Sequence, residues 1–293
     1  MSPVRIWIMA ARPRTLPAAI APVLVGTALG ATEGDLRVGG FIAALLGAIF
    51  IQVGTNLSND YSDARRGADT EERLGPVRVT AGGLVPPRQV LVATYVSFAA
   101  AVLCGIYLVI LAGPILLLSG ALSILAGVLY TGGPRPYGYE GLGEVFVFTF
   151  FGLVAVAGSY YVQAEQVTWE ALVLAVPVGL LASAILVVNN VRDLDTDRRA
   201  GKRTLAVRLG RQRARTLYDL MVYGAFVSAP LPWVLGALSA WLLLPLVLLP
   251  LAVQLARTVR NHTDGPTLNG ALARTGMLQL LFCTLLATGL LLS

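Results

Sequence analysis

The sequence predicts an all-α, multi-pass membrane protein, and three observations point to that fold class. Of the 293 residues, 56% are hydrophobic and only 13% are charged, whereas soluble domains carry about 25% charged residues. Apolar stretches recur along the whole chain, and a helix needs about 20 such residues to cross a bilayer. Basic residues gather in alternate connections between these stretches, as they do in membrane proteins.

Nine apolar stretches are predicted to be membrane-spanning helices. The third and fourth meet at Ala112, Gly113 and Pro114, a sequence typical of a tight turn, and the seventh and eighth meet near Gly236. In chain order, the predicted spans are residues 16–32, 39–58, 89–111, 114–131, 142–162, 169–190, 215–235, 238–256 and 271–292. We expect them to form a single domain over residues 1–293.

The arginines predict how these helices are oriented. The chain has 22 basic residues, of which only Lys202 is a lysine. If the N-terminus is cytoplasmic, Arg37 is the only basic residue in a predicted external segment, as the positive-inside rule favours. One missed span would exchange the sides of all later segments. The pattern therefore predicts nine helices, a cytoplasmic N-terminus and an external C-terminus.

Several other classes of function are disfavoured by the composition. The isoelectric point near 9.6 does not indicate a nucleic-acid partner, because no basic stripe is interleaved with aromatic residues. Cys104 and Cys283 lie in apolar runs without metal-site spacing, and we interpret them as small core residues. No GxxxxGK[ST] loop for nucleotide phosphates occurs.

Two polar segments, after the second and the sixth predicted spans, share a pattern. They read NLSNDYSDARRGADT (residues 56–70) and NNVRDLDTDRRAGK (residues 189–202). Aligning Asn59 with Asn189 places Asp63 on Asp193, with an offset of about 130 residues or four helices. An even number of spans preserves orientation, so the sequence predicts two parallel four-helix pseudo-repeats followed by a ninth helix.

Helical spacing groups the polar residues of each segment on one face. In the first segment, Asn56, Asn59, Asp60 and Asp63 stand at i, i+3, i+4 and i+7. In the second, Asn189, Asp193 and Asp197 stand at i, i+4 and i+8, while Asp195 points to the opposite side. Carboxylates near a helix C-terminus meet the negative end of the macrodipole, so their clustering indicates that a cation lies between them.

Oxygen ligands and neighbouring cations predict the kind of ligand. Asp and Asn oxygens suit Mg²⁺, which is commonly held by one or two carboxylates together with substrate phosphates. Zinc is disfavoured because there is no cysteine pair and His262 is the only histidine. Arg78, Lys202 and Arg203 lie where they could bind phosphate oxygens. In a membrane protein, this combination predicts a lipid diphosphate bridged by Mg²⁺ to both aspartate clusters.

The paired motifs, NDxxD at Asn59–Asp63 and DxxxD at Asp193–Asp197, resemble those of the UbiA-type intramembrane aromatic prenyltransferases. The resemblance covers nearly the whole chain and implies nine helices around a central cavity. The stretches ARPRTLPAAIAPVLVGTALG, NLSNDYSDARRGAD and GPVRVTAGG are similar to the branch that acts on 1,4-dihydroxy-2-naphthoate in menaquinone biosynthesis.

The resemblance also implies roles for individual residues. One Mg²⁺ would be held by Asn59, Asp60, Asp63 and Asp69, with Gly67 turning Asp69 back, and a second by Asp193 and Asp197 with Asn189 or Asn190. Of these ligands, Asp60, Asp63, Asp193 and Asp197 would be the catalytic carboxylates. The diphosphate would be bound by Arg66, Arg78, Arg135, Lys202 and Arg203, and the substrates oriented by Asn56, Tyr130, Glu144 and Asn190.

One feature departs from the family pattern. Many members carry a Tyr-x-x-x-Lys pair after the fourth span, but here Tyr130 is followed four residues later by Pro134, with Arg135 next. Arg135 is the residue that could take the place of the missing lysine.

The implied reaction is Mg²⁺-dependent transfer of a polyprenyl group from polyprenyl diphosphate to 1,4-dihydroxy-2-naphthoate. Carbon dioxide and diphosphate are lost, and demethylmenaquinone is formed. The site would lie at the cytoplasmic side of the cell membrane, in contact with membrane lipid, and we expect neither a nucleic-acid partner nor an obligate protein partner. The alternatives are another aromatic acceptor, such as 4-hydroxybenzoate or homogentisate, and a cation or phosphate transporter. A transporter is disfavoured because its carboxylates would be expected near the midplane.

Overall fold

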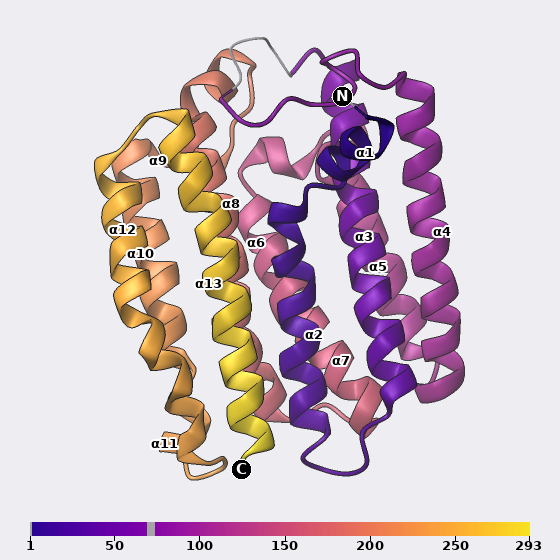
Figure 1. Ribbon diagram of the computed structural model, residues 1–293, viewed down its shortest axis with the longest axis vertical. Helices are drawn as coiled ribbons and strands as arrows, with labels where there is room; N and C mark the ends of the chain where they lie inside the picture. Colours follow the sequence, from indigo (N-terminus) through magenta and orange to yellow (C-terminus); the bar gives the residue numbers. More distant parts are fainter. Residues whose placement is uncertain (1, 69–73) are drawn as a thin grey trace.

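The computed structural model describes residues 2–68 and 74–293, and the regular structure of those residues is entirely helical. The long helices run side by side, with the N-terminus at one end of the molecule and the C-terminus at the other (Figure 1). Asp69, one of the predicted Mg²⁺ ligands, lies outside the described residues.

Six helices of the described residues are long and apolar enough to cross a membrane, which agrees with the predicted class. They are α3 (Val38–Arg65), α4 (Pro87–Ala112), the continuous helix α6–η3–α7 (Gly143–Ala164), α8 (Trp169–Arg199), η4–α12 (Ala240–Asn261) and α13 (Gly265–Leu291). Three further helices coincide with predicted spans: α2 (Leu16–Gly30), α5 (Ile115–Leu129) and α10 (Arg211–Ser228). Helices α2 and α5 have only 15 residues each, and α10 begins with a basic turn, so the count of nine crossings stays a prediction.

Short helices occupy several predicted connections. Helix α1 (Pro3–Ala11) precedes α2, and the turn between them contains Arg12 in the left-handed region at φ 53° and a 3₁₀ turn, η1 (Pro13–Thr15). The elements η2 (Tyr137–Glu140) and α9 (Leu205–Leu209) also lie in predicted connections, whereas α11 (Leu231–Val234) lies inside the span predicted at residues 215–235, because α10 ends earlier, at Ser228. Their brevity explains why hydrophobic periodicity did not predict them.

Helices α3 and α8 continue well past the ends predicted from hydropathy. The predicted spans end at residues 58 and 190, whereas the helices end at Arg65 and Arg199. Their polar last turns therefore stand on the same helices that cross the apolar layer, and both lie at the end of the bundle that carries the N-terminus (Figure 1). Gly67 follows α3 at φ 65°, so the chain does turn at this position.

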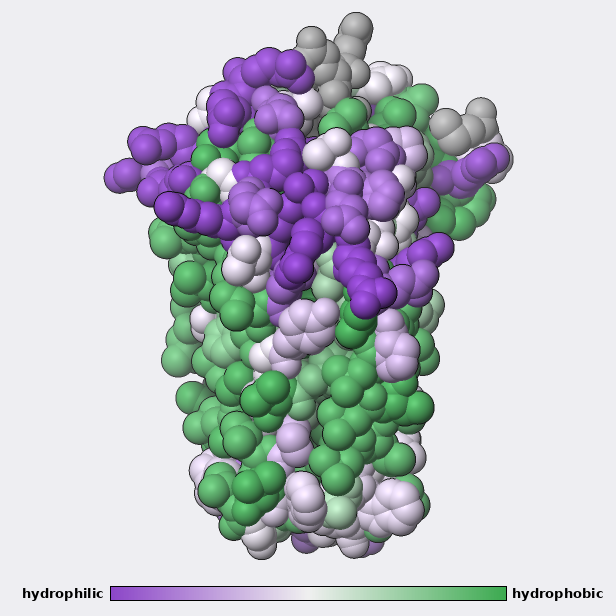
Figure 2. Space-filling model, turned by 90° about the vertical axis from the view of Figure 1, so that its left-hand side faces the viewer, coloured by the Kyte–Doolittle hydropathy of each residue, from purple (hydrophilic) through white to green (hydrophobic). Residues whose placement is uncertain are grey.

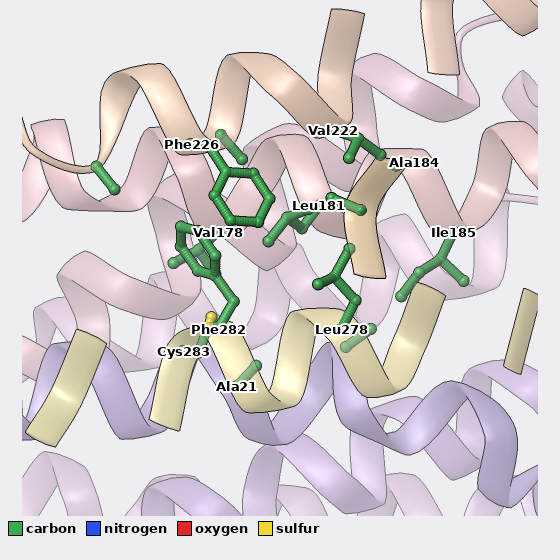
Figure 3. Close-up of a cluster of buried hydrophobic side chains, with 14 of the residues drawn as sticks. Ala21, Val178, Leu181, Ala184, Ile185, Val222, Phe226, Leu278, Phe282 and Cys283 are labelled. Carbon is green, nitrogen blue, oxygen red and sulfur yellow. The ribbon is translucent and has the colours of Figure 1, made fainter. Parts of the chain in front are cut away.

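Packing of α8 against α2, α10 and α13 forms the main core (Figure 3). Phe226 of α10 meets Phe282 of α13 edge to face, with ring centroids 5.1 Å apart. Cys283 is fully buried beside them, as predicted, while Cys104 is partly exposed on α4. Lipid is as apolar as these side chains, so close van der Waals packing rather than the hydrophobic effect holds the helices together.

Polar and apolar surfaces are separated along the bundle. On the face shown in Figure 2, hydrophilic residues gather at the end that carries the N-terminus, and a broad hydrophobic surface lies below them. Arg37 lies near the other end of α3, where its guanidinium pairs with Glu165 at 2.6 Å. The loops that follow the polar ends of α3 and α8 thus lie on one side of the apolar layer.

The approach of α2 to α7 (Ala155–Ala164) depends on Gly26. A Cβ at this position would overlap the carbonyl oxygen of Val156 and lie 2.9 Å from Cβ of Ser159. Gly26→Val should therefore force the two helices apart and cost about 1–3 kcal/mol of stability. The midpoint of thermal unfolding in detergent measures this loss.

Gly120→Ala is the matched control, because a Cβ at Gly120 would meet no atom within 4 Å. Its unfolding midpoint should stay close to that of the unsubstituted protein. Equal midpoints for the two variants would contradict the packing role of Gly26.

Candidate active site

A cavity of about 280 Å³ opens within the bundle, between α2, α3, α5, η3 (Phe148–Val154) and α8. One end is lined by polar and charged side chains from the last turns of α3 and α8. The rest is lined mainly by apolar and aromatic residues, including Ile51, Phe151 and Leu186. The cavity thus combines a charged mouth with a hydrophobic interior.

The α3 side of the mouth contains three of the four residues predicted to share a face. Asn56, Asn59 and Asp63 line the cavity. Asp60 does not, because its carboxylate accepts hydrogen bonds from the backbone N–H groups of Val79 at 3.1 Å and Thr80 at 2.9 Å. Successive helical residues turn by about 100°, which puts Asp60 at the edge of the face and directs it to the loop.

Asp63 is the most heavily bonded carboxylate of the mouth. It is only 2% exposed, and it accepts hydrogen bonds from the hydroxyl of Tyr139 at 2.6 Å, Arg78 Nη2 at 3.3 Å and Lys202 Nζ at 3.4 Å. Lys202 also lies over the Tyr139 ring, 4.8 Å from its centroid. Two cations and a hydroxyl thus compensate this buried charge, as burial of a carboxylate requires.

The α8 side of the mouth contributes the second group, which lines the same cavity and consists of Asn189, Asn190, Asp193 and Asp197. Asp193 is held by the buried Arg192, whose Nε donates to Oδ1 at 2.8 Å and whose Nη2 donates to Oδ2. Arg192 also donates to Asn189 at 2.8 Å and to Asn269 at 2.6 Å. Asn269 in turn donates to the carbonyl of Leu74, which ties α8 to α13 and to the loop after α3.

Asp195 lies on the other side of α8, as its spacing predicts. It is exposed and pairs with Arg211 at 2.6 Å. The structure therefore separates it from the two aspartates that line the cavity.

Two of the five cations predicted to bind diphosphate, Arg78 and Lys202, line the cavity. Arg135 is 81% exposed and pairs with Glu140 at 3.2 Å, and this hydrogen bond and charge lower the pKa of Glu140. Arg66 donates to the carbonyl of Gly133, and the Arg203 side chain is exposed. The positions of these three arginines give no support to direct binding of a ligand in the cavity, because their loops direct them outward.

Aromatic side chains form one wall of the cavity. Tyr130 meets Tyr137 edge to face at 5.5 Å, and Tyr137 stacks on Phe146 at 3.9 Å. Phe150, in the π-helical segment η3, continues the stack at 6.2 Å from Phe146. Glu144 is buried behind this wall, does not line the cavity, and accepts a hydrogen bond from Asn190 at 2.9 Å. Its position supports a role in orienting Asn190 rather than direct contact with a ligand.

Several lining residues were not predicted individually from the sequence. Arg12, Thr15 and Gln52 line the inner side of the mouth, and Tyr139 contacts Asp63. Arg12 and Thr15 lie in the stretch ARPRT, but nothing in the spacing of that stretch indicates that α1 ends against α3. Contacts between segments far apart in the chain bring these residues to the cavity.

Among residues 2–68 and 74–293, the charged residues that line the cavity are balanced in number. They are three cations, Arg12, Arg78 and Lys202, and three anions, Asp63, Asp193 and Asp197. Within residues 2–68 and 74–293, no three His, Cys, Asp or Glu side chains are arranged to hold a metal ion.

Comparison with known sequences identifies the family. A model described as the UbiA prenyltransferase family matches residues 19–286. A 1,4-dihydroxy-2-naphthoate octaprenyltransferase from Mycobacterium tuberculosis (strain ATCC 25618 / H37Rv) is 44% identical over 284 residues, covering 97% of this chain and 96% of the relative. A protein of the same name from Escherichia coli (strain K12) is 38% identical over 299 residues, covering 100% of this chain and 97% of the relative.

Solved structures share the fold. A UbiA homolog from Archaeoglobus fulgidus bound to GPP and Mg²⁺ matches with a TM-score of 0.70 at 15% identity, covering 98% of this chain and 100% of that chain. At 15% identity, this match is evidence for a shared fold and for nothing further. The family model, in contrast, spans most of the chain, and the curated relatives are similar over nearly their full lengths. The chain belongs to the UbiA prenyltransferase family.

Proposed function

We propose that this protein transfers a polyprenyl group from polyprenyl diphosphate to 1,4-dihydroxy-2-naphthoate, with loss of carbon dioxide and diphosphate, in menaquinone biosynthesis. The observation that carries the proposal is one cavity with a mouth of carboxylates and cations and an apolar, aromatic interior. Such a cavity suits a substrate with an anionic head and a long hydrocarbon tail. The naphthoate acceptor is supported by the names of the curated relatives.

The charge balance of the mouth supports Mg²⁺ as cofactor. A diphosphate ester carries about three negative charges near neutral pH, and the lining offers three cations already offset by three anions. Binding would therefore need added positive charge, which two Mg²⁺ ions would supply. The donors are all oxygen and few in number, which fits Mg²⁺, an ion commonly held by one or two carboxylates plus phosphates. The residues that would hold the ions are Asn59, Asp63, Asn189, Asp193 and Asp197, with Asp69 from outside the described residues.

The first step is departure of diphosphate from the donor. The allylic C–O bond breaks, its electron pair leaves with the diphosphate oxygen, and an allylic carbocation remains. Arg78 and Lys202 hydrogen-bond the phosphate oxygens and stabilise the charge that develops there. Mg²⁺ held by Asn59, Asp63, Asn189, Asp193 and Asp197 would supply further positive charge to the leaving group.

The second step joins the two substrates. The ring carbon that bears the carboxylate donates an electron pair to the carbocation, helped by the adjacent hydroxyl. The carboxylate then leaves as carbon dioxide and returns its bonding pair to the ring. No net proton transfer is required, because an ionised carboxylate is lost as a neutral molecule while a cation is consumed. The balanced product is the quinol form of demethylmenaquinone.

The interior of the cavity protects the carbocation during this step. Water would convert it to an alcohol, so the reacting carbon must be kept dry. Tyr130, Tyr137, Phe146 and Phe150 line the cavity, and aromatic rings can stabilise a cation through their π electrons.

We also propose the orientation of the molecule. The chain is an integral membrane protein, and its polar end with the N-terminus lies on the cytoplasmic side of the cell membrane, after which nine crossings place Ser293 outside. Asn59 with Asp63 and Asn189 with Asp193 line one mouth from corresponding helix ends, which supports two four-helix pseudo-repeats and a ninth helix.

Product analysis tests the reaction directly. Purified protein with 1,4-dihydroxy-2-naphthoate, a polyprenyl diphosphate and Mg²⁺ should yield a prenylated product whose mass lacks the carboxyl group. Carboxyl-labelled acceptor should release labelled carbon dioxide, and a chelator should stop both. Parallel reactions with 4-hydroxybenzoate and homogentisate serve as controls, and turnover of either in place of the naphthoate would contradict the assigned acceptor.

Substitution of the cavity aspartates tests the two-sided mouth. Asp63→Asn and Asp193→Asn each keep the side-chain volume but remove a negative charge, so prenyl transfer should fall by about 100-fold or more. Asp195→Asn is the matched control on α8, because Asp195 is exposed and pairs with Arg211. Near-normal turnover by either cavity variant would refute the model.

Thiol labelling tests the orientation. In a variant that lacks Cys104 and Cys283, Ser293→Cys should react with a membrane-impermeant reagent in intact cells. Arg203→Cys, at the polar end, should react only after permeabilisation. Labelling of both positions from the same side would disprove an odd number of crossings.

A further inference from the structure

A buried amide oxygen in the inner part of the cavity has no role in the reaction as derived so far. Gln52 lies on α3, 7% exposed, and lines the cavity one helical turn before Asn56. Its Oε1 has no hydrogen-bond partner among the described residues. Buried amide oxygens are nearly always paired, so an unpaired one on a residue that lines a cavity points to a donor on a ligand.

The neighbours of Gln52 determine which end of its amide faces the cavity. Its Nε2 donates to Thr15 Oγ1 at 3.1 Å, and Asn56 Nδ2 donates to the same oxygen at 3.1 Å. The Thr15 hydroxyl itself donates a hydrogen bond to the carbonyl of Arg12 at 3.0 Å. If the Gln52 amide were rotated by half a turn, Oε1 would lie against Thr15 Oγ1. The hydroxyl of Thr15 already donates to the Arg12 carbonyl, so it could not donate to Oε1. The network therefore keeps Nε2 on Thr15 and leaves Oε1 to the ligand.

The substrates of the proposed reaction offer one kind of donor for this oxygen. A polyprenyl tail has no polar hydrogen, and an ionised diphosphate or carboxylate only accepts hydrogen bonds. Both hydroxyls of the naphthoate can donate. The one beside the carboxylate is engaged by that carboxylate within the molecule, which leaves the hydroxyl on the opposite side of the ring.

Gln52 also lies at a depth suited to the acceptor ring. It precedes Asp63 by 11 residues on α3, which is about 16 Å along the helix axis. The diphosphate belongs at the charged end near Asp63 and Lys202, so Gln52 faces the region beyond it. Ile51 and Ala48 line that region.

We infer that Gln52 Oε1 accepts a hydrogen bond from the acceptor hydroxyl farthest from the carboxylate, and so makes the enzyme selective for 1,4-dihydroxy acids. This inference rests on the proposed function. The hydroxyl is not conjugated with the attacked carbon in a way that assists attack. Gln52 is therefore a residue of specificity and positioning rather than of bond making.

The test compares two acceptors, 1,4-dihydroxy-2-naphthoate and 1-hydroxy-2-naphthoate, which lacks only the hydroxyl in question. Wild-type protein should prefer the diol by about tenfold or more in kcat/KM. Gln52→Leu should lower kcat/KM for the diol by about tenfold, change it little for the analogue, and so abolish the preference. The KM for prenyl diphosphate should not change, which shows that the charged mouth is intact.

Gln279→Leu is the matched control. Gln279 is also fully buried with an unpaired Oε1, but it lies on α13 and does not line the cavity. This variant should keep the wild-type preference for the diol. The inference is overturned if Gln52→Leu keeps that preference, as it would if water filled the site, or if it loses activity equally with both acceptors. Absence of wild-type turnover with the diol would instead refute the proposed function, and this inference with it.

Discussion

The compensation of one buried carboxylate, Asp63, is the interaction on which the arrangement of the mouth depends. Arg78, Tyr139 and Lys202 reach it from three segments that are far apart in the chain. Asp63 is only 2% exposed, and burial of a carboxylate costs free energy unless such partners compensate for its lost hydration. The same contacts thus satisfy the charge, join the loops to α3, and hold two cations beside the cavity where an anionic head group would bind.

The buried carboxylate of Asp193 is compensated in a different way. Its partner is Arg192, the preceding residue, and the fully buried guanidinium also reaches Asn189 and Asn269. Asn269 extends the network to the carbonyl of Leu74. The two sides of the mouth therefore differ: the carboxylate on α3 is bonded by residues from distant loops, and the one on α8 by an arginine of its own helix. Breaking either network would leave a buried charge without a partner, which costs more than an absent surface ion pair.

Helical periodicity predicted a large part of the site. The i, i+3, i+7 spacing places Asn56, Asn59 and Asp63 on the cavity side of α3, and the spacing on α8 separates Asp195 from Asp193. It could not predict that Asp60, at the edge of the same face, would bind the backbone of Val79 and Thr80. Periodicity describes directions around one helix, and the choice between a loop and a cavity at the edge of a face is made by neighbouring segments.

The sequence by itself determined the membrane class, the positions of most apolar helices and the two aspartate-bearing helix ends, because these follow from local composition and from spacing along one helix. The family followed from the resemblance of its motifs to those of known proteins. Only the tertiary structure decided which cations face the cavity. Lys202 turns inward over Tyr139, while Arg135 turns outward to Glu140. It also decided that Gln52 lines the cavity and that its amide oxygen has no partner among the described residues. These outcomes depend on contacts between segments that are far apart in the chain, and local spacing does not encode such contacts.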